Sequence, residues 1–176
     1  MEIVFATNNE NKIIEVGKII PAHIKLLSLK EIGCDTDIPE NENTLEGNSL
    51  QKANFIFQKF QKNCLADDTG LEISSLDGAP GVHSARYAGE PSNSQKNIEK
   101  VLQELRDKKD RSAQFRTVFT LIINGNIFQF DGVVKGKIID DLRGTSGFGY
   151  DPIFVPDGYS KTFAELNLDI KNEISH

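Results

Sequence analysis

Two β-type runs joined by Asn124-Gly125 constrain the fold of this chain most strongly. Residues 114–123 and 127–134 are rich in β-branched and aromatic side chains, and such side chains favour strands. Asn-Gly is the pair that a type I′ turn prefers, and this turn connects antiparallel strands. The sequence therefore predicts a long β-hairpin in the second half of the chain.

The N-terminal half has a different pattern, in which strands and helices follow each other. Residues 2–6 are predicted to form a buried strand, and residues 9–20 an amphipathic helix that stops before Pro21. The other predicted elements are a strand over 23–29, an acidic loop over 33–43, a helix over 44–61 capped by Asn43, strands over 64–67 and 71–76 with a turn at Gly70, and a helix from a capping box at Ser92 to Arg106. This order, together with the hairpin, predicts an α/β fold with a mixed β-sheet and flanking helices.

Composition and charge limit the class of protein. The chain has 176 residues, 38% hydrophobic and 26% charged, which is enough for one domain or for two lobes that share a core. Its most apolar run, 118–123, is too short to cross a membrane, and no basic leader precedes the first strand. Cys34 and Cys64 form no CxxC pair, so we expect reduced, buried thiols and a cytoplasmic protein without a membrane partner.

The net charge of −6 makes a nucleic acid polymer a poor partner, because binding a phosphate backbone depends on a basic surface. A small anion can still bind where cations converge. Lys12, Lys52 and Lys171 each lie within a polar motif and are the candidates for such a convergence.

The first of these motifs joins the first strand to the first helix and consists of Thr7, Asn8, Asn9, Glu10, Asn11 and Lys12. A helix N-terminus offers unpaired N–H groups and partial positive charge, so short polar side chains beside Lys12 can hold a triphosphate. A polar turn with an Asn cap explains the same residues equally simply.

A second motif, Asp67-Asp68-Thr69-Gly70, places two acids at the predicted end of an apolar strand. Such carboxylates are hard oxygen ligands for magnesium, and Asp68 can also act as a general base. Glu40 and Glu42 of the acidic loop could reach the same metal ion. The alternatives are an Asp-rich turn and solvated surface charges; an aspartic protease is disfavoured because no second Asp-Thr-Gly occurs.

Two glycine-rich segments complete the set of candidate motifs, residues 78–89 and 143–152. In the second, Phe148 stands between two glycines and can lie flat against a planar base, and Asp151 can accept a hydrogen bond from it. Ordinary glycine-rich turns remain an alternative. Neither a dinucleotide-binding GxGxxG fingerprint nor a GxxxxGK[ST] phosphate loop is present.

Taken together, these segments resemble the inosine-triphosphate pyrophosphatase family, also described as XTP/dITP diphosphatases. The resemblance runs nearly from end to end and is carried by TNNENK, LADDTGLEI, GAPGVHSARYAGE, GTSGFGYDPIF, TFAEL and KNEISH. It implies a two-lobed α/β fold with a nucleotide cleft between the lobes, usually a homodimer, and Mg²⁺-dependent hydrolysis of ITP, dITP or XTP to the monophosphate and pyrophosphate.

The resemblance also assigns roles by position. It implies that the metal ligands are Glu40 and Asp68, that Asp68 is the catalytic base, and that the substrate-binding residues are Thr7 to Lys12, Lys52, Thr69, Phe148, Gly149, Tyr150, Asp151, Lys171 and His176. Lys171 and His176 match the part of the pocket that recognises the 6-oxo group.

The chain departs from the family pattern at three points. Gly47 stands where a glutamate is usual, His83 replaces a tyrosine, and the sequence stops at His176, before the arginine and terminal helix of the pattern. The alternatives to this function are a pyrophosphatase for other unusual nucleotides, such as modified pyrimidine triphosphates, and a nucleotide-binding protein without catalysis.

Overall fold

The computed structural model describes residues 1–174, and the chain divides into two compact units. Unit 1 comprises Met1–Asp68 and Val118–Asp131, and unit 2 comprises Thr69–Thr117 and the chain from Gly132 onward. Three strands contribute residues to both units: β3 (Cys64–Ile73), β5 (Ser112–Ile123) and β6 (Asn126–Ile138). None of the described helices is both long enough and apolar enough to cross a membrane.

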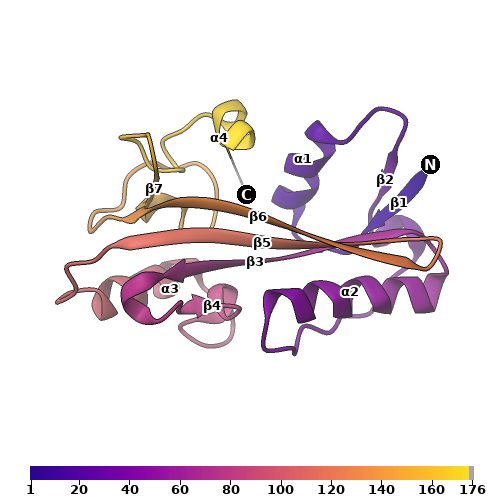
Figure 1. Ribbon diagram of the computed structural model, residues 1–176, viewed down its shortest axis with the longest axis horizontal. Coiled ribbons are helices and arrows are strands. Elements are labelled where there is room, and N and C mark those ends of the chain that lie inside the picture. Colours follow the sequence, from indigo (N-terminus) through magenta and orange to yellow (C-terminus); the bar gives the residue numbers. More distant parts are fainter. Residues whose placement is uncertain (175–176) are drawn as a thin grey trace. The chain divides into compact units, whose positions relative to one another are not determined.

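Unit 1 is built around β1 (Glu2–Phe5), which runs parallel to β2 (Lys25–Leu27) on one side and to β3 on the other. Its helices are α1 (Glu10–Ile19) and α2 (Leu45–Phe60), with a short 3₁₀ helix at Lys30–Ile32. Figure 1 shows α1 and α2 on opposite sides of these strands. The core of unit 1 consists of Val4, Ala6, Leu27, Leu29, Cys34, Ala53, Ile56, Cys64, Ala66 and Ile122.

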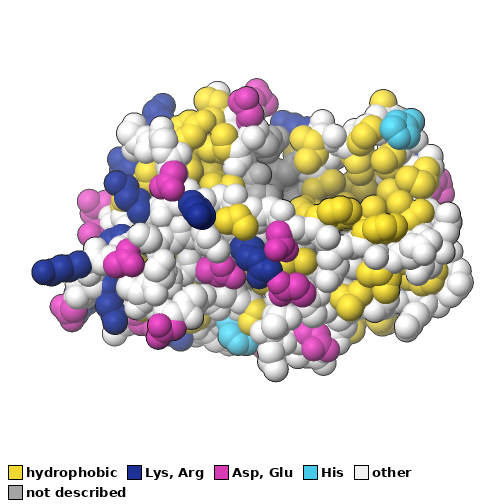
Figure 2. Space-filling view, viewed as in Figure 1, with side chains coloured by type: hydrophobic (Ala, Val, Ile, Leu, Met, Phe, Trp, Pro, Cys, Tyr) yellow, Lys and Arg dark blue, Asp and Glu magenta, His cyan; other side chains and the backbone are white. Residues whose placement is uncertain are grey.

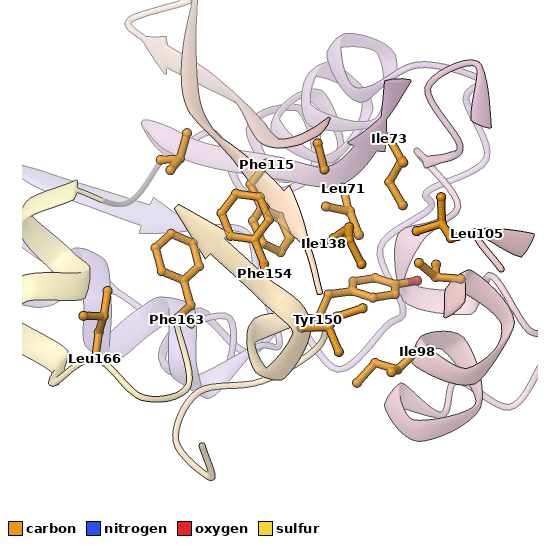
Figure 3. Close-up of a cluster of buried hydrophobic side chains, with 14 residues drawn as sticks. Leu71, Ile73, Ile98, Leu105, Phe115, Ile138, Tyr150, Phe154, Phe163 and Leu166 are labelled. Atoms are coloured by element: carbon orange, nitrogen blue, oxygen red, sulfur yellow. The ribbon is translucent and has the colours of Figure 1, made fainter. Parts of the chain in front are cut away.

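Unit 2 contains two short antiparallel additions to the sheet, β4 (Pro80–Gly81) on β3 and β7 (Phe154–Pro156) on β6. Its helices are α3 (Ser94–Glu104) and α4 (Leu168–Ile174), with 3₁₀ helices at Ser74–Leu76, Ser84–Arg86 and Asp151–Ile153. Three rings pack together in its core (Figure 3): the centroids of Phe115 and Phe154 are 4.8 Å apart, and those of Phe154 and Phe163 are 5.1 Å apart.

The strand order β2-β1-β3-β5-β6-β7, with β4 beside β3, confirms the predicted mixed sheet. The hairpin is confirmed too, and its strands are longer than predicted. Asn124 and Gly125 have φ angles of 51° and 82°, and positive φ at both central residues is what a type I′ turn needs.

The predicted turn at Gly70 is wrong, because β3 runs without interruption from Cys64 to Ile73. Gly70 is required for another reason: a Cβ there would lie 2.5 Å from the carbonyl oxygen of Gly81 on β4. A missing side chain thus permits close approach of a neighbouring strand. As a consequence, Asp67 and Asp68 lie within a strand and not at its end.

Both predicted helix caps are displaced by one residue. Thr44 caps α2, since its side chain accepts from the N–H of Gly47 at 3.0 Å, and Asn93 caps α3 by accepting from the N–H of Lys96 at 2.9 Å. Neighbouring polar residues have similar capping preferences, so tertiary packing decides between them.

Candidate active site

The candidate site begins where β1 ends and β3 continues. The amide of Ala6 donates to the carbonyl of Leu65 at 2.8 Å, after which the chain leaves the sheet and enters α1. Asp67 and Asp68 therefore lie beyond the carboxyl end of β1. In open α/β sheets, ligands bind outside the carboxyl ends of parallel strands.

The connection from β1 to α1 carries the predicted phosphate-binding motif. The hydroxyl of Thr7 accepts from the amide of Asn9 at 3.1 Å, and the carbonyl of Asn9 accepts from the amide of Ile13 at 3.2 Å. Asn8 is exposed between them, and α1 begins at Glu10, so the backbone of Asn11 lies in its first turn. The motif thus opens a helix, as predicted.

Asp67 and Asp68 point in opposite directions, because successive residues of a strand alternate between the faces of a sheet. Asp67 faces α1, where it is buried and forms an ion pair with Lys12. Burial alone would lower the pKa of Lys12, but the carboxylates of Asp67, Asp68 and Glu40 outweigh burial and raise it. Lys12 is thus held as a cation at the end of β1.

Asp68 faces α2 and is contacted through both of its carboxylate oxygens. Lys52 Nζ lies 3.7 Å from Asp68 Oδ1, and Asn48 Nδ2 donates to Asp68 Oδ2 at 3.0 Å. Burial raises the pKa of Asp68 above its ordinary value, in spite of these two contacts, and the charge of Glu40 adds to the shift. The side chain is 13% exposed, so water can still reach it.

Lys52 brings Glu40 of the acidic loop to the same place. Its ammonium group donates to Glu40 Oε1 at 2.6 Å, and its own side chain is only 7% exposed. Glu40 and Asp68 therefore lie around one buried cation. We call Lys12, Lys52, Glu40, Asp67 and Asp68 the acidic cluster.

The acidic cluster has the donors that magnesium prefers, which are carboxylate oxygens. When all five side chains are ionised, two lysines against three carboxylates leave a net charge of −1. A triphosphate would add further negative charge, so its binding here calls for an additional cation. Within residues 1–174, no three His, Cys, Asp or Glu side chains are grouped to enclose a metal ion, but magnesium commonly takes one or two carboxylates and completes its shell with water and substrate phosphates.

Three of the predicted residues form a second group, in unit 2. Asp151 Oδ2 accepts from the backbone amide of Phe148 and from Lys171 Nζ, both at 2.9 Å. The ammonium group of Lys171 lies 4.8 Å from the centroid of the Phe148 ring. Asp151 and Lys171 are buried, whereas Phe148 is 37% exposed, so the phenyl ring can take part in stacking.

The loop that holds this group depends on glycine. Gly147 and Gly149 have φ angles of 78° and 59°, and a Cβ at Gly147 would lie 2.0 Å from Asp151 Oδ2. Tyr150, in contrast, belongs to the core of unit 2, and its hydroxyl donates to the carbonyl of Ser84 at 2.8 Å. It therefore anchors the loop by its side chain.

The remaining predicted residues are placed as follows. The hydroxyl of Thr69, the residue after Asp68, lies 2.7 Å from that of Thr117 in unit 2. Lys12 and Lys52 belong to unit 1 and Lys171 to unit 2, so their convergence on one anion stays a prediction. His176 lies outside the described residues.

Sequence reasoning missed Asn48, which contacts both Asp68 and the acidic loop. A signal for it was available: Asn48 and Lys52 are four residues apart on α2 and therefore share one face of the helix. Gly47, the departure from the family pattern, lies against the same loop. A Cβ there would lie 2.7 Å from the Cβ of Glu42, so Glu42 packs into the space that a side chain at 47 would need.

Comparisons with known proteins agree on one family. The family model that matches residues 3–176 describes the Ham1 family. The dITP/XTP pyrophosphatase of Flavobacterium psychrophilum is 54% identical over 176 residues, which cover 100% of this chain and 93% of that protein. That of Porphyromonas gingivalis is 48% identical, with 99% and 91% covered.

Solved structures give the same result. The Staphylococcus aureus Ham1 protein superposes with a TM-score of 0.91 at 40% identity, and a HAM1 protein from Coxiella burnetii with a TM-score of 0.93 at 39% identity. Each match covers 100% of this chain and 92% of the solved one. By sequence and by fold, the chain belongs to the Ham1 family.

Proposed function

We propose that this protein hydrolyses deaminated purine nucleoside triphosphates, namely ITP, dITP and XTP, to the monophosphate and pyrophosphate. The observation that carries the proposal is the acidic cluster, in which Asp68 and Glu40 lie around Lys52 beyond the carboxyl end of β1. The relatives at 54% and 48% identity are named dITP/XTP pyrophosphatases, which supports the same reaction.

The phosphates would be bound by Lys12, Lys52 and the first turn of α1. Both ammonium groups are paired with carboxylates, and the N-terminus of α1 adds backbone donors and partial positive charge. We propose that Glu40 and Asp68 hold Mg²⁺. The chemistry that this ion supplies is neutralisation of the phosphate oxygens and polarisation of the α-phosphate.

Asp68 is suited to hold and deprotonate the attacking water. Its side chain is 13% exposed, so water can approach a carboxylate that is already oriented by Asn48 and Lys52. In the proposed reaction, the water oxygen attacks the α-phosphorus, its proton moves to Asp68, and the bond to the β-phosphate breaks as pyrophosphate leaves. Asn48 and Lys52 keep the carboxylate directed during this step.

The base would be recognised by the group in unit 2. Phe148 offers a partly exposed ring for stacking, and Lys171 is held in place by Asp151. A lysine ammonium can only donate hydrogen bonds. It therefore favours the 6-oxo group of inosine or xanthine, which accepts a hydrogen bond, over the 6-amino group of adenine, which is itself a donor.

The test is pyrophosphate release from ITP, XTP, GTP and ATP, with and without Mg²⁺, by the wild-type chain and by Asp68→Asn. We expect metal-dependent release from ITP and XTP, much slower release from ATP, and no turnover by a folded Asp68→Asn protein. GTP shares the 6-oxo group, so its rate measures discrimination against the 2-amino group. Preferential cleavage of methylated pyrimidine triphosphates would contradict the substrate class, and tight ITP binding without product would contradict catalysis.

We also propose that the protein is a cytoplasmic homodimer. Ile127, Phe128 and Phe130 of β6 are each about half exposed, at 51%, 48% and 56%, and Figure 2 shows hydrophobic side chains gathered over this strand. Single exposed apolar residues are ordinary, but adjacent aromatic ones mark contact surfaces. Sedimentation analysis should give a dimer for the wild type and a monomer for Phe130→Asp; a wild-type monomer would contradict the proposal.

A further inference from the structure

Asn48 is an unusual residue for its position on α2. It is the fourth residue of the helix and 1% exposed. Asparagine competes with helix formation through its side chain, and a buried amide is costly unless its polar atoms have partners. Both ends of this amide do: Nδ2 donates to Asp68 Oδ2 at 3.0 Å, and Oδ1 accepts from the backbone amide of Glu42 at 2.9 Å.

The orientation of the Asn48 amide is fixed by chemistry. A backbone N–H can only donate, so the amide oxygen must face Glu42 and the NH₂ group must face Asp68. One side chain therefore ties the acidic loop to the carboxylate of Asp68. Together with the contact of Lys52 at Asp68 Oδ1, it defines the plane of that carboxylate.

Resting on the proposed function, we propose that Asn48 is a positioning residue, which orients the Asp68 carboxylate for metal binding and for water activation. It acts through Asp68 and does not itself touch the substrate. Residues that orient metal-binding carboxylates in this way are worth roughly 10- to 100-fold in metal affinity or activity.

Three variants separate this role from a merely structural one. Asn48→Asp keeps an acceptor for the Glu42 amide and removes the donor to Asp68. Asn48→Leu has a similar shape and removes both contacts. Gln51→Leu is the matched control on the same helix. Gln51 binds the acidic loop through Asn41, with hydrogen bonds of 3.1 and 2.6 Å, and these bonds do not involve Asp68.

We expect both Asn48 variants to lower kcat for ITP by roughly 10- to 100-fold, with a much smaller change in KM. In the absence of nucleotide, Asn48→Leu should weaken Mn²⁺ binding, measured by calorimetry, by about 10-fold or more. Gln51→Leu should stay within about twofold of the wild type in kcat and in Mn²⁺ affinity, since it leaves Asp68 oriented. Folded Asn48 variants that match Gln51→Leu in both measurements would overturn the proposal.

A second measurement does not depend on the folding of these variants. The side-chain NH₂ resonances of Asn48 are assigned by NMR in the wild type. They should shift when Mg²⁺ is added to the wild type, and they should also differ between the wild type and the Asp68→Asn variant. Unchanged resonances in both cases would overturn the proposed coupling. If the wild type released no pyrophosphate from ITP, the proposed function would fail by itself, while metal affinity and these resonances would still report on Asn48.

Discussion

The buried ion pair between Lys171 and Asp151 allows a quantitative prediction. The two side chains are each 6% exposed, and Lys171 Nζ lies 2.9 Å from Asp151 Oδ2. Three variants test the pair: Asp151→Asn, Lys171→Met, and the double variant. An asparagine at 151 can still accept from the amide of Phe148, so the hydrogen bond that holds the loop need not be lost.

The magnitude follows from burial and distance. At 2.9 Å and an effective dielectric constant of about 20, the Coulomb attraction is roughly 6 kcal/mol before desolvation is counted. Removal of one partner leaves a buried charge uncompensated, so each single variant should lower the free energy of unfolding by about 3–5 kcal/mol. The double variant buries no charge, so it should cost clearly less than either single change.

Urea unfolding followed by tyrosine fluorescence measures these differences. The chain has no tryptophan and 3 tyrosines, and Tyr87, Tyr150 and Tyr159 all belong to unit 2, as does the ion pair. Single variants that cost less than about 1 kcal/mol, or a double variant that costs the sum of the two, would refute the reasoning, since the pair would then behave like a surface salt bridge. The double variant should regain stability without regaining a low KM for ITP, because the donor to the base is gone.

Three further predictions concern single residues. Phe148→Ala should raise KM for ITP by roughly 5- to 160-fold in steady-state assays, because stacking of a base on an aromatic ring is worth about 1–3 kcal/mol. Phe148→Tyr is the control, and an unchanged KM for the alanine variant would argue against stacking. Gly70→Ala should lower the free energy of unfolding by about 1–3 kcal/mol, because the new Cβ would lie 2.5 Å from a backbone oxygen. Far-UV circular dichroism measures this change. Gly17→Ala is the control and should not destabilise the protein, because no atom lies within 4 Å of the new Cβ. Burial raises the pKa of Cys64 to about 12, so at pH 8 only about one thiol in ten thousand is ionised. In a variant with Cys34 replaced by serine, iodoacetamide should therefore label Cys64 only after unfolding. Rapid labelling of the native protein would contradict the burial of Cys64.

Much of the fold could be predicted because its signals are local. The period of apolar residues marked α1, α2 and α3, and Asn124-Gly125 marked the hairpin turn, where both residues have positive φ. The boundaries were less predictable. Thr44 and Asn93 are the caps where Asn43 and Ser92 were predicted, because adjacent polar residues compete for one capping position and packing selects between them.

The candidate site was predictable as a set of residues and not as an arrangement. Local sequence suggested that the two acids share the end of a strand, yet β3 continues through them and turns Asp67 toward Lys12 and Asp68 toward Lys52. In the sheet β3 lies between β1 and β5, and its far end also pairs with β4, where the small size of Gly70 permits close approach. The pairings of β3 with β1 and with β5 join segments that are distant in sequence, and such pairing leaves little trace in either segment alone.

The sequence by itself determined the order of strands and helices, the hairpin, and the identity of the charged and aromatic residues, because these depend on side-chain periodicity and turn chemistry within a few residues. Only the tertiary structure decided which polar side chains meet: Lys52 with Glu40, Lys171 with Asp151, and Asn48 with Asp68. Each of these contacts joins residues from separate elements, and their geometry is set by how strands pair and helices pack.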